Sequence, residues 1–136
     1  NARTPMQWDE SKNAGFSTGQ PWLAVNPNYQ AINVQEALAN PDSIFYTYQK
    51  LVQIRKENSW LIRADFELLE TTDKVFVYIR KDGNRRFLVV ANLSNEEQDL
   101  TVEGNVKSVL IENTVAQEVF EKQILAPWDA FCVELL

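Results

Sequence analysis

The sequence predicts a mainly β protein, in which a C-terminal antiparallel β-sandwich follows a long loop and one helix. Three observations carry this prediction. From Ala64 onward, apolar residues recur at every second position, which is the period of strands that bury one face. Between Ser43 and about Asn58 they recur at helical spacing, and residues 1–32 show no sustained period. Short strands that follow one another without intervening helices favour an antiparallel sandwich.

The predicted strands are rich in β-branched and aromatic residues and stand between turn-forming residues. Strong candidates span residues 64–69, 74–80, 86–93, 99–102, 106–111 and 130–135, and weaker ones span 117–120 and 123–125. Lys81–Asn84 reads Lys-Asp-Gly-Asn between two strong strands, and Asp-Gly supplies the positive φ that a tight hairpin needs. A second reversal is expected at Glu103–Asn105.

The helix predicted from Ser43 to about Asn58 carries a wide apolar stripe, with Asn40 or Ser43 as its cap. A short helical turn is expected before it. Asn33 can accept a hydrogen bond from a free backbone N–H, and Glu36, three residues later, can reach back.

Composition excludes several classes of function. The chain has 136 residues, 45% hydrophobic and 24% charged, which is ordinary for a soluble globular protein with one core. No apolar stretch approaches the ~20 residues of a membrane span, and no leader pattern is present, so no membrane partner is expected. The net charge of -6 argues against nucleic acid, and the basic pairs at 80–81 and 85–86 are interpreted as solvated charges at a hairpin tip.

The residues available for chemistry are also limited. Cys132 is the one cysteine, which fits a reducing, cytoplasmic compartment. The chain has no histidine, which removes His-assisted nucleophilic catalysis and the usual zinc ligand sets. No metal or cofactor is therefore predicted. The 19 acidic residues fall in turns and at strand ends, so none is predicted to be catalytic.

A set of short motifs at the start of the sequence points to a family. Asn1–Asp9 is dense, turn-forming sequence without an initiator Met, so we expect it to lie inside a longer protein. This motif resembles the start of the same region in the oligo-1,6-glucosidase and dextran glucosidase branch of the alpha-amylase superfamily. The resemblance continues through Ala14–Ser17, Pro21–Leu23, Val25–Tyr29, Tyr46–Leu51 and Arg55–Glu57.

The resemblance implies a division of the chain. Residues 1–62 would be the tail of a catalytic (β/α)8 barrel, comprising its final loop and last helix, and residues 63–136 the C-terminal β-sandwich domain. It also implies a parent enzyme that is a retaining, exo-acting glucosidase of terminal α-1,6-linked glucose. The catalytic carboxylates would then precede residue 1, and the partners of this chain would be the parent's barrel and, in the full-length enzyme, an oligosaccharide.

Arg3 is the one residue predicted to meet substrate, because a guanidinium offers a planar fork of donors to sugar hydroxyls. Two roles stay open for it: reaching the rim of the active site, or pinning the loop. Met6, Gln7 and Trp8 are interpreted as structural, through buried side chains and satisfied amides.

A rival hypothesis is a freestanding carbohydrate-binding or interaction module on the same sandwich. Trp60, Tyr78 and Trp128 are interpreted as core or junction residues, and a row of exposed aromatic residues on one sheet face would favour the rival. A further alternative is the same region of a trehalose-phosphate hydrolase or a sucrose isomerase.

Overall fold

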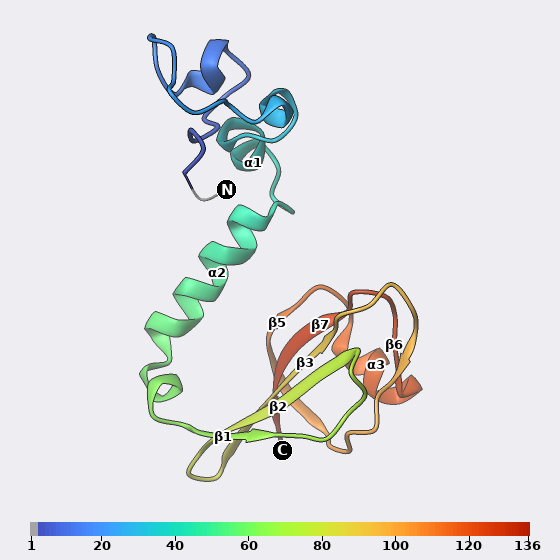
Figure 1. The fold of residues 1–136 in the computed structure, drawn as a ribbon. Helices are drawn as coiled ribbons and strands as arrows, with labels where there is room; N and C mark the ends of the chain where they lie inside the picture. Colours follow the sequence, from blue (N-terminus) through green and yellow to red (C-terminus); the bar gives the residue numbers. More distant parts are fainter. Residues whose placement is uncertain (1–2) are drawn as a thin grey trace. The chain divides into compact units, whose positions relative to one another are not determined.

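The computed structural model describes residues 3–136, so Asn1 and Ala2, which open the motif, lie outside the described residues. The chain divides into two compact units, Asn1–Val52 and Gln53–Leu136. Each unit is described by itself (Figure 1).

The first unit is irregular up to its helices, as the lack of a period predicts. It contains the 3₁₀ turns Lys12–Gly15 and Pro27–Gln30, helix α1 (Val34–Ala39) and most of helix α2 (Ile44–Glu57). The Asn33 side chain caps α1 by accepting a hydrogen bond from the Glu36 backbone N–H at 2.9 Å. The predicted helix start and the predicted long helix are both confirmed, the latter to within one residue at each end.

The second unit is built on a five-stranded antiparallel sheet with the order β1-β2-β3-β7-β5. Its strands are β1 (Asp65–Leu68), β2 (Val75–Asp82), β3 (Arg85–Asn92), β5 (Val106–Glu112) and β7 (Ala130–Leu135). A two-stranded ladder pairs β4 (Gln98–Asp99) with β6 (Ile124–Leu125). This mainly antiparallel architecture is consistent with the predicted sandwich.

The β2–β3 hairpin is where the sequence places it. Asp82 pairs with Arg85, which leaves Gly83 and Asn84 as the two-residue loop. Gly83 has a φ of 57°, the left-handed conformation that tight hairpins need and that glycine adopts without steric cost.

The two faces of the sheet differ in burial. Val75, Val77 and Ile79 of β2 point to the inner face, where they are at most 6% exposed. Their register partners extend this face across β3 and β7, and it packs against α3 (Ala116–Lys122) and the β4–β6 ladder (Figure 1). The alternate residues of β2, Phe76, Tyr78 and Arg80, define the outer face.

Two strand predictions are wrong. Of the strong candidate 99–102 only Asp99 lies in a strand, β4. The weak candidate 117–120 lies in helix α3. Ala116 and Val119, three residues apart, are both buried, which is a helical spacing. The Glu112 carboxylate accepts a hydrogen bond from the Ala116 N–H at 2.9 Å, and Lys122 bonds Glu118 one turn away at 2.7 Å. Among the described helices, none is long and apolar enough to cross a membrane.

The buried inner face should make the second unit the slowest to open. We expect hydrogen exchange of the backbone amides of Val75–Tyr78 to be slower than that of residues 3–29, because core strands open only with the global free energy of unfolding. Mass spectrometry of exchanged peptides measures this. Equal protection in the two segments would contradict it.

Candidate functional site

The N-terminal loop, which carries the motif, is tied to α1 through Gln7. Its Nε2 donates to Asn28 Oδ1 at 3.0 Å and also to the Ile32 carbonyl. The Gln7 carbonyl accepts from the Val34 N–H at 2.9 Å, and the Trp8 carbonyl accepts from the next N–H of α1 at 3.0 Å. These contacts agree with the structural role expected of Gln7.

A tight turn around Asp9 shapes the next part of the loop. The Asp9 carboxylate accepts hydrogen bonds from the N–H and the hydroxyl of Ser11, which lower its pKa. Ala14 and Gly15 have φ values of 57° and 66°. A Cβ at Gly15 would come within 2.6 Å of an Asp9 carboxylate oxygen, so only glycine fits there without a shift of that side chain. Asp9 therefore builds the turn.

Arg3 lies beside an exposed aromatic ring of the same loop. Its guanidinium carbon is 5.3 Å from the centroid of the Trp22 ring, a cation–π distance, and Trp22 is 79% exposed. The Arg3 guanidinium and the Trp22 indole thus lie together in the first unit. A guanidinium can donate hydrogen bonds to a sugar, and an indole ring can stack on one. Met6 and Trp8 were expected to be buried, but each is 50% exposed.

The carboxyls with a shifted pKa do not suit a general acid, which would need a raised pKa. Every carboxyl whose pKa departs from its usual value has a lowered pKa, because a hydroxyl or a cation hydrogen-bonds it. These carboxyls belong to Asp9, Glu67, Glu96, Glu118 and Glu134. No group of three or more potential ligands among residues 3–136 could hold a metal ion. Burial raises the pKa of the half-buried Cys132 thiol to about 11, which suits the predicted strand residue and not a nucleophile.

An ion cluster around the Glu134 carboxylate occupies one end of the outer face. Glu134 has a side chain only 7% exposed, and its Oε1 lies 3.0 Å from Arg85 Nε and 2.9 Å from Lys107 Nζ. Hydrogen bonds from Arg85 and then Lys107 lower the pKa of Glu134 to about 2. Arg85 is exposed at the hairpin, as expected, with 45% of its side chain accessible, and its guanidinium also pairs with Glu134 and lies 4.6 Å from the Phe87 ring centroid.

The segment that leads into β1 is fixed to the same face. The Trp60 ring stacks on Phe87 with centroids 3.9 Å apart and an interplanar angle of 23°. Arg80 donates from Nη2 to the carbonyls of Leu61 at 2.6 Å and Ala64 at 2.7 Å. Trp60 is thus a junction residue, as expected, and Arg80 has a structural role that its place near the hairpin did not reveal.

The remainder of the outer face carries a row of three aromatic rings. Tyr78 lies 5.1 Å from Phe66 and 5.4 Å from Phe76 between ring centroids. Phe66 is 58% exposed and Phe76 is 44% exposed. The expectation that Tyr78 belongs to the core is wrong, since its side chain points away from Val77 and Ile79. Trp128, at 59% exposed, is not a core residue either.

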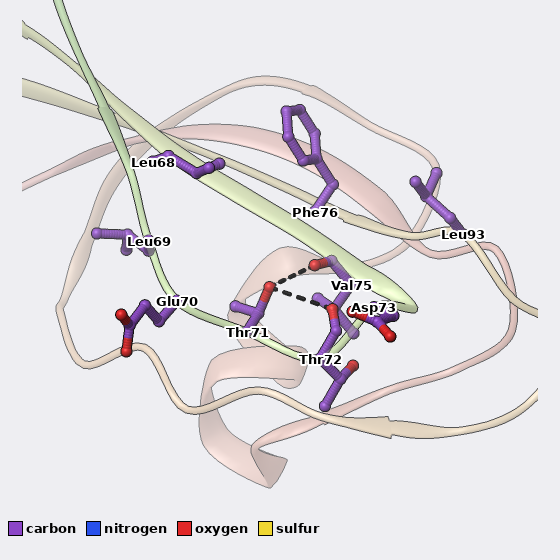
Figure 2. A pocket seen from close by; sticks show the side chains of 9 residues that line it. All are labelled: Leu68, Leu69, Glu70, Thr71, Thr72, Asp73, Val75, Phe76 and Leu93. Carbon is purple, nitrogen blue, oxygen red and sulfur yellow. Dashed lines mark hydrogen bonds between the residues drawn. The ribbon is translucent and has the colours of Figure 1, made fainter.

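A pocket of about 360 Å³ adjoins this row at the β1–β2 connection. Figure 2 shows Phe76 and Leu93 along one side of it and the loop residues along the other. The Thr71 hydroxyl donates to the Val75 carbonyl within the loop, so it helps to form the turn. The residues that line the pocket are Leu68, Leu69, Glu70, Thr71, Thr72, Asp73, Val75, Phe76 and Leu93.

Two family models match separate parts of the chain. A model of the alpha amylase catalytic domain matches residues 1–64, and a model of the alpha-amylase SusG C-terminal domain matches residues 75–129. Both models describe parts of alpha-amylase proteins, and the chain belongs to the alpha-amylase superfamily.

The chain is similar along its whole length to individual members of this superfamily. The chain is 91% identical to glucan 1,6-alpha-glucosidase of Streptococcus pneumoniae over 100% of this chain and 25% of the relative. It is 42% identical to oligo-1,6-glucosidase of Bacillus cereus over 99% of this chain and 25% of the relative. A solved trehalose-6-phosphate hydrolase of Bacillus licheniformis matches with a TM-score of 0.87 and 34% identity, over 99% of this chain and 26% of that one. The chain thus spans about a quarter of the length of these relatives.

The Glu134 cluster generates a prediction about acid stability. Glu134→Gln should lower the free energy of unfolding at neutral pH by about 1–3 kcal/mol, because two cations lose their anionic partner. The folded pKa of about 2 lies below the ordinary 4.5, so the stabilisation is present above 4.5 and is lost as pH falls from there toward 2. Urea unfolding across this pH range measures the difference between wild type and variant.

The matched control is Glu118→Gln, which removes a carboxylate from an exposed ion pair on α3. It should have a smaller effect at neutral pH, because water screens that pair. The interpretation fails if the Glu134→Gln difference stays constant down to about pH 2.5.

Proposed function

We propose that this chain is the C-terminal region of a retaining, exo-acting glucosidase that removes terminal α-1,6-linked glucose from isomalto-oligosaccharides and dextran. The observation that carries the proposal is the near identity, along the whole chain, to a glucan 1,6-alpha-glucosidase. In such an enzyme two carboxylates act as nucleophile and acid/base.

Within this enzyme the chain has a supporting role. Residues 1–62 form the last loop and helix of the barrel, and residues 63–136 form the C-terminal domain; the end of the catalytic-domain match at residue 64 supports this boundary. The catalytic pair lies elsewhere in the enzyme, which agrees with the lowered pKa values of the carboxyls described above. The enzyme acts without a cofactor in the cytoplasm, and the absence of any cysteine pair supports that location.

Arg3 contributes to the rim of the active site in this proposal. Its guanidinium stands over an indole ring that is itself largely exposed, in a loop whose frame is fixed by Gln7 and Asp9. The hydrogen bonds hold the loop backbone in place while the Arg3 and Trp22 side chains stay exposed. This arrangement suits a loop that contacts substrate.

The 136-residue chain should by itself have no glucosidase activity, because in this proposal both catalytic carboxylates lie elsewhere in the enzyme. The assay uses isomaltose and an aryl α-glucoside at high protein concentration. Turnover that survives purification and disappears on mutation of a carboxylate of this chain would refute the expectation.

In the full-length enzyme, Arg3→Ala should lower kcat/KM for short isomalto-oligosaccharides roughly ten- to hundredfold, the effect of losing a charge-assisted contact worth ~1.5–3 kcal/mol. The melting temperature should change little. Lys12→Ala, at an exposed cation of the same loop, is the control and should leave both quantities unchanged. If Arg3→Ala lowers the melting temperature and leaves kcat/KM intact, Arg3 only pins the loop.

A further inference from the structure

We infer that Trp22 is a specificity-determining residue of the enzyme, and that its indole ring stacks on the sugar unit to which the terminal glucose is linked. The inference rests on the proposed function, because it takes the substrate to be an isomalto-oligosaccharide. It assigns a residue to the leaving group of the reaction, which neither the overall activity nor the role of Arg3 specifies.

The Trp22 ring is left open by its own unit. At 79% exposure it is more exposed than any other aromatic side chain that the structure describes. Its neighbours Pro21, Leu23 and Val25 are half-buried, so they hold the segment on the unit while Trp22 is directed outward. Exposure of an indole is unfavourable in water, because it is a large apolar surface that gains from contact with a ligand.

Hydrogen bonds fix the chain on both sides of Trp22. Before it, Asn13 Nδ2 donates to the Gly19 carbonyl at 2.9 Å. After it, Asn26 Oδ1 accepts from the Asn28 N–H at 3.3 Å and caps a 3₁₀ turn. A ring presented on a fixed backbone loses little conformational freedom when a ligand stacks on it, which is the property that a binding platform needs.

Arg3 adds directed hydrogen bonding to this platform. Its guanidinium carbon lies 5.3 Å from the centroid of the Trp22 ring, so a sugar that accepts hydrogen bonds from Arg3 also lies beside the indole. A pyranose carries hydroxyls around its edge and C–H groups on its faces. Small-molecule sites pair aromatic surface with a few polar groups that fix orientation, and the Arg3–Trp22 pair offers both.

The exo-acting chemistry decides which sugar unit Trp22 meets. An exo-acting enzyme removes one terminal unit, so its site is closed beyond that unit, and the rest of the substrate extends through the open side. The catalytic carboxylates flank the bond to the terminal glucose. A ring as open as Trp22, on a loop at the rim, belongs to the open side. Its ligand is therefore the sugar of the leaving group.

Two substrates of the full-length enzyme separate the leaving-group sugar from the terminal glucose. Isomaltotriose has both, whereas α-glucosyl fluoride has the same glucose and no leaving-group sugar. Trp22→Ala should lower the ratio of kcat/KM for isomaltotriose to kcat/KM for the fluoride by roughly five- to twentyfold, because only isomaltotriose loses the stacking contact. An unchanged ratio would overturn the inference.

Two further variants control this measurement. Trp22→Phe keeps an aromatic ring and should restore most of the ratio. Phe16→Ala removes another exposed aromatic side chain of the same loop, 48% exposed, and should leave the ratio as it is in the wild type. If Trp22→Phe loses the ratio as fully as Trp22→Ala does, an aromatic platform is not what the position supplies, and the inference fails.

A merely structural role for Trp22 has a different signature. Trp22→Ala would then lower the melting temperature, or lower kcat/KM for both substrates equally, and either result without a change in the ratio contradicts stacking. A double-mutant cycle with Arg3→Ala adds a second readout of the same ratio. The combined loss should be smaller than the product of the two single losses, because both side chains hold one sugar. Multiplicative losses would contradict a shared sugar.

Hydrolysis of isomaltotriose by the wild-type enzyme tests the proposed function separately. If the wild type does not hydrolyse it, the proposed function fails and the role of Trp22 fails with it. If the wild type hydrolyses it and the ratio does not depend on Trp22, only the role of Trp22 fails.

Discussion

Contact between the inner sheet face and the residues beneath it is the interaction on which the C-terminal unit depends. Val77, Leu88, Val90 and Val133 come from three neighbouring strands and are each 0% exposed. Because side chains alternate along a strand, this one buried set also decides which residues must face outward. Glu134, Arg80 and the aromatic row take their positions from that alternation.

The outward-facing residues form two groups, one paired and covered within the unit and one apolar and exposed. Near the hairpin, a carboxylate with low exposure is neutralised by two cations, and an indole covers the adjacent phenyl ring. Farther along β2, apolar rings lie open. The first group is covered and paired by residues of its own unit, and the second is left exposed by that unit.

Much of this architecture is readable from the sequence, because periodicity reports directly on burial. The five strands of the main sheet, the long helix and the Asn33 cap follow from local pattern. Helix α3 was missed because its seven residues are too few to show a helical period, and its N-terminus relies on Glu112 from the preceding strand. A strand prediction also states that Val77 and Tyr78 face opposite ways, but not which face will be covered.

The candidate site was less predictable, because it depends on contacts between residues that are far apart in sequence. Arg3 stands out by its chemistry, whereas the ring beside it is nineteen positions away and is brought near by a turn with left-handed residues. Glu134 could have been suspected, since it is the one charge in a strand that otherwise reads as apolar. Its two cations come from different strands, and single-sequence patterns carry no information about such pairings.

The strand order has a consequence for how the sheet forms. Strand β7 is the last in sequence, yet it lies between β3 and β5 and supplies the sheet partner of β5. The β1–β2–β3 meander can assemble from local contacts, whereas β5 has no place in the sheet until β7 arrives. The sheet contacts between residues far apart in sequence therefore form mainly when β7 pairs with β3 and β5. Until β7 pairs, β3 presents an unpaired edge.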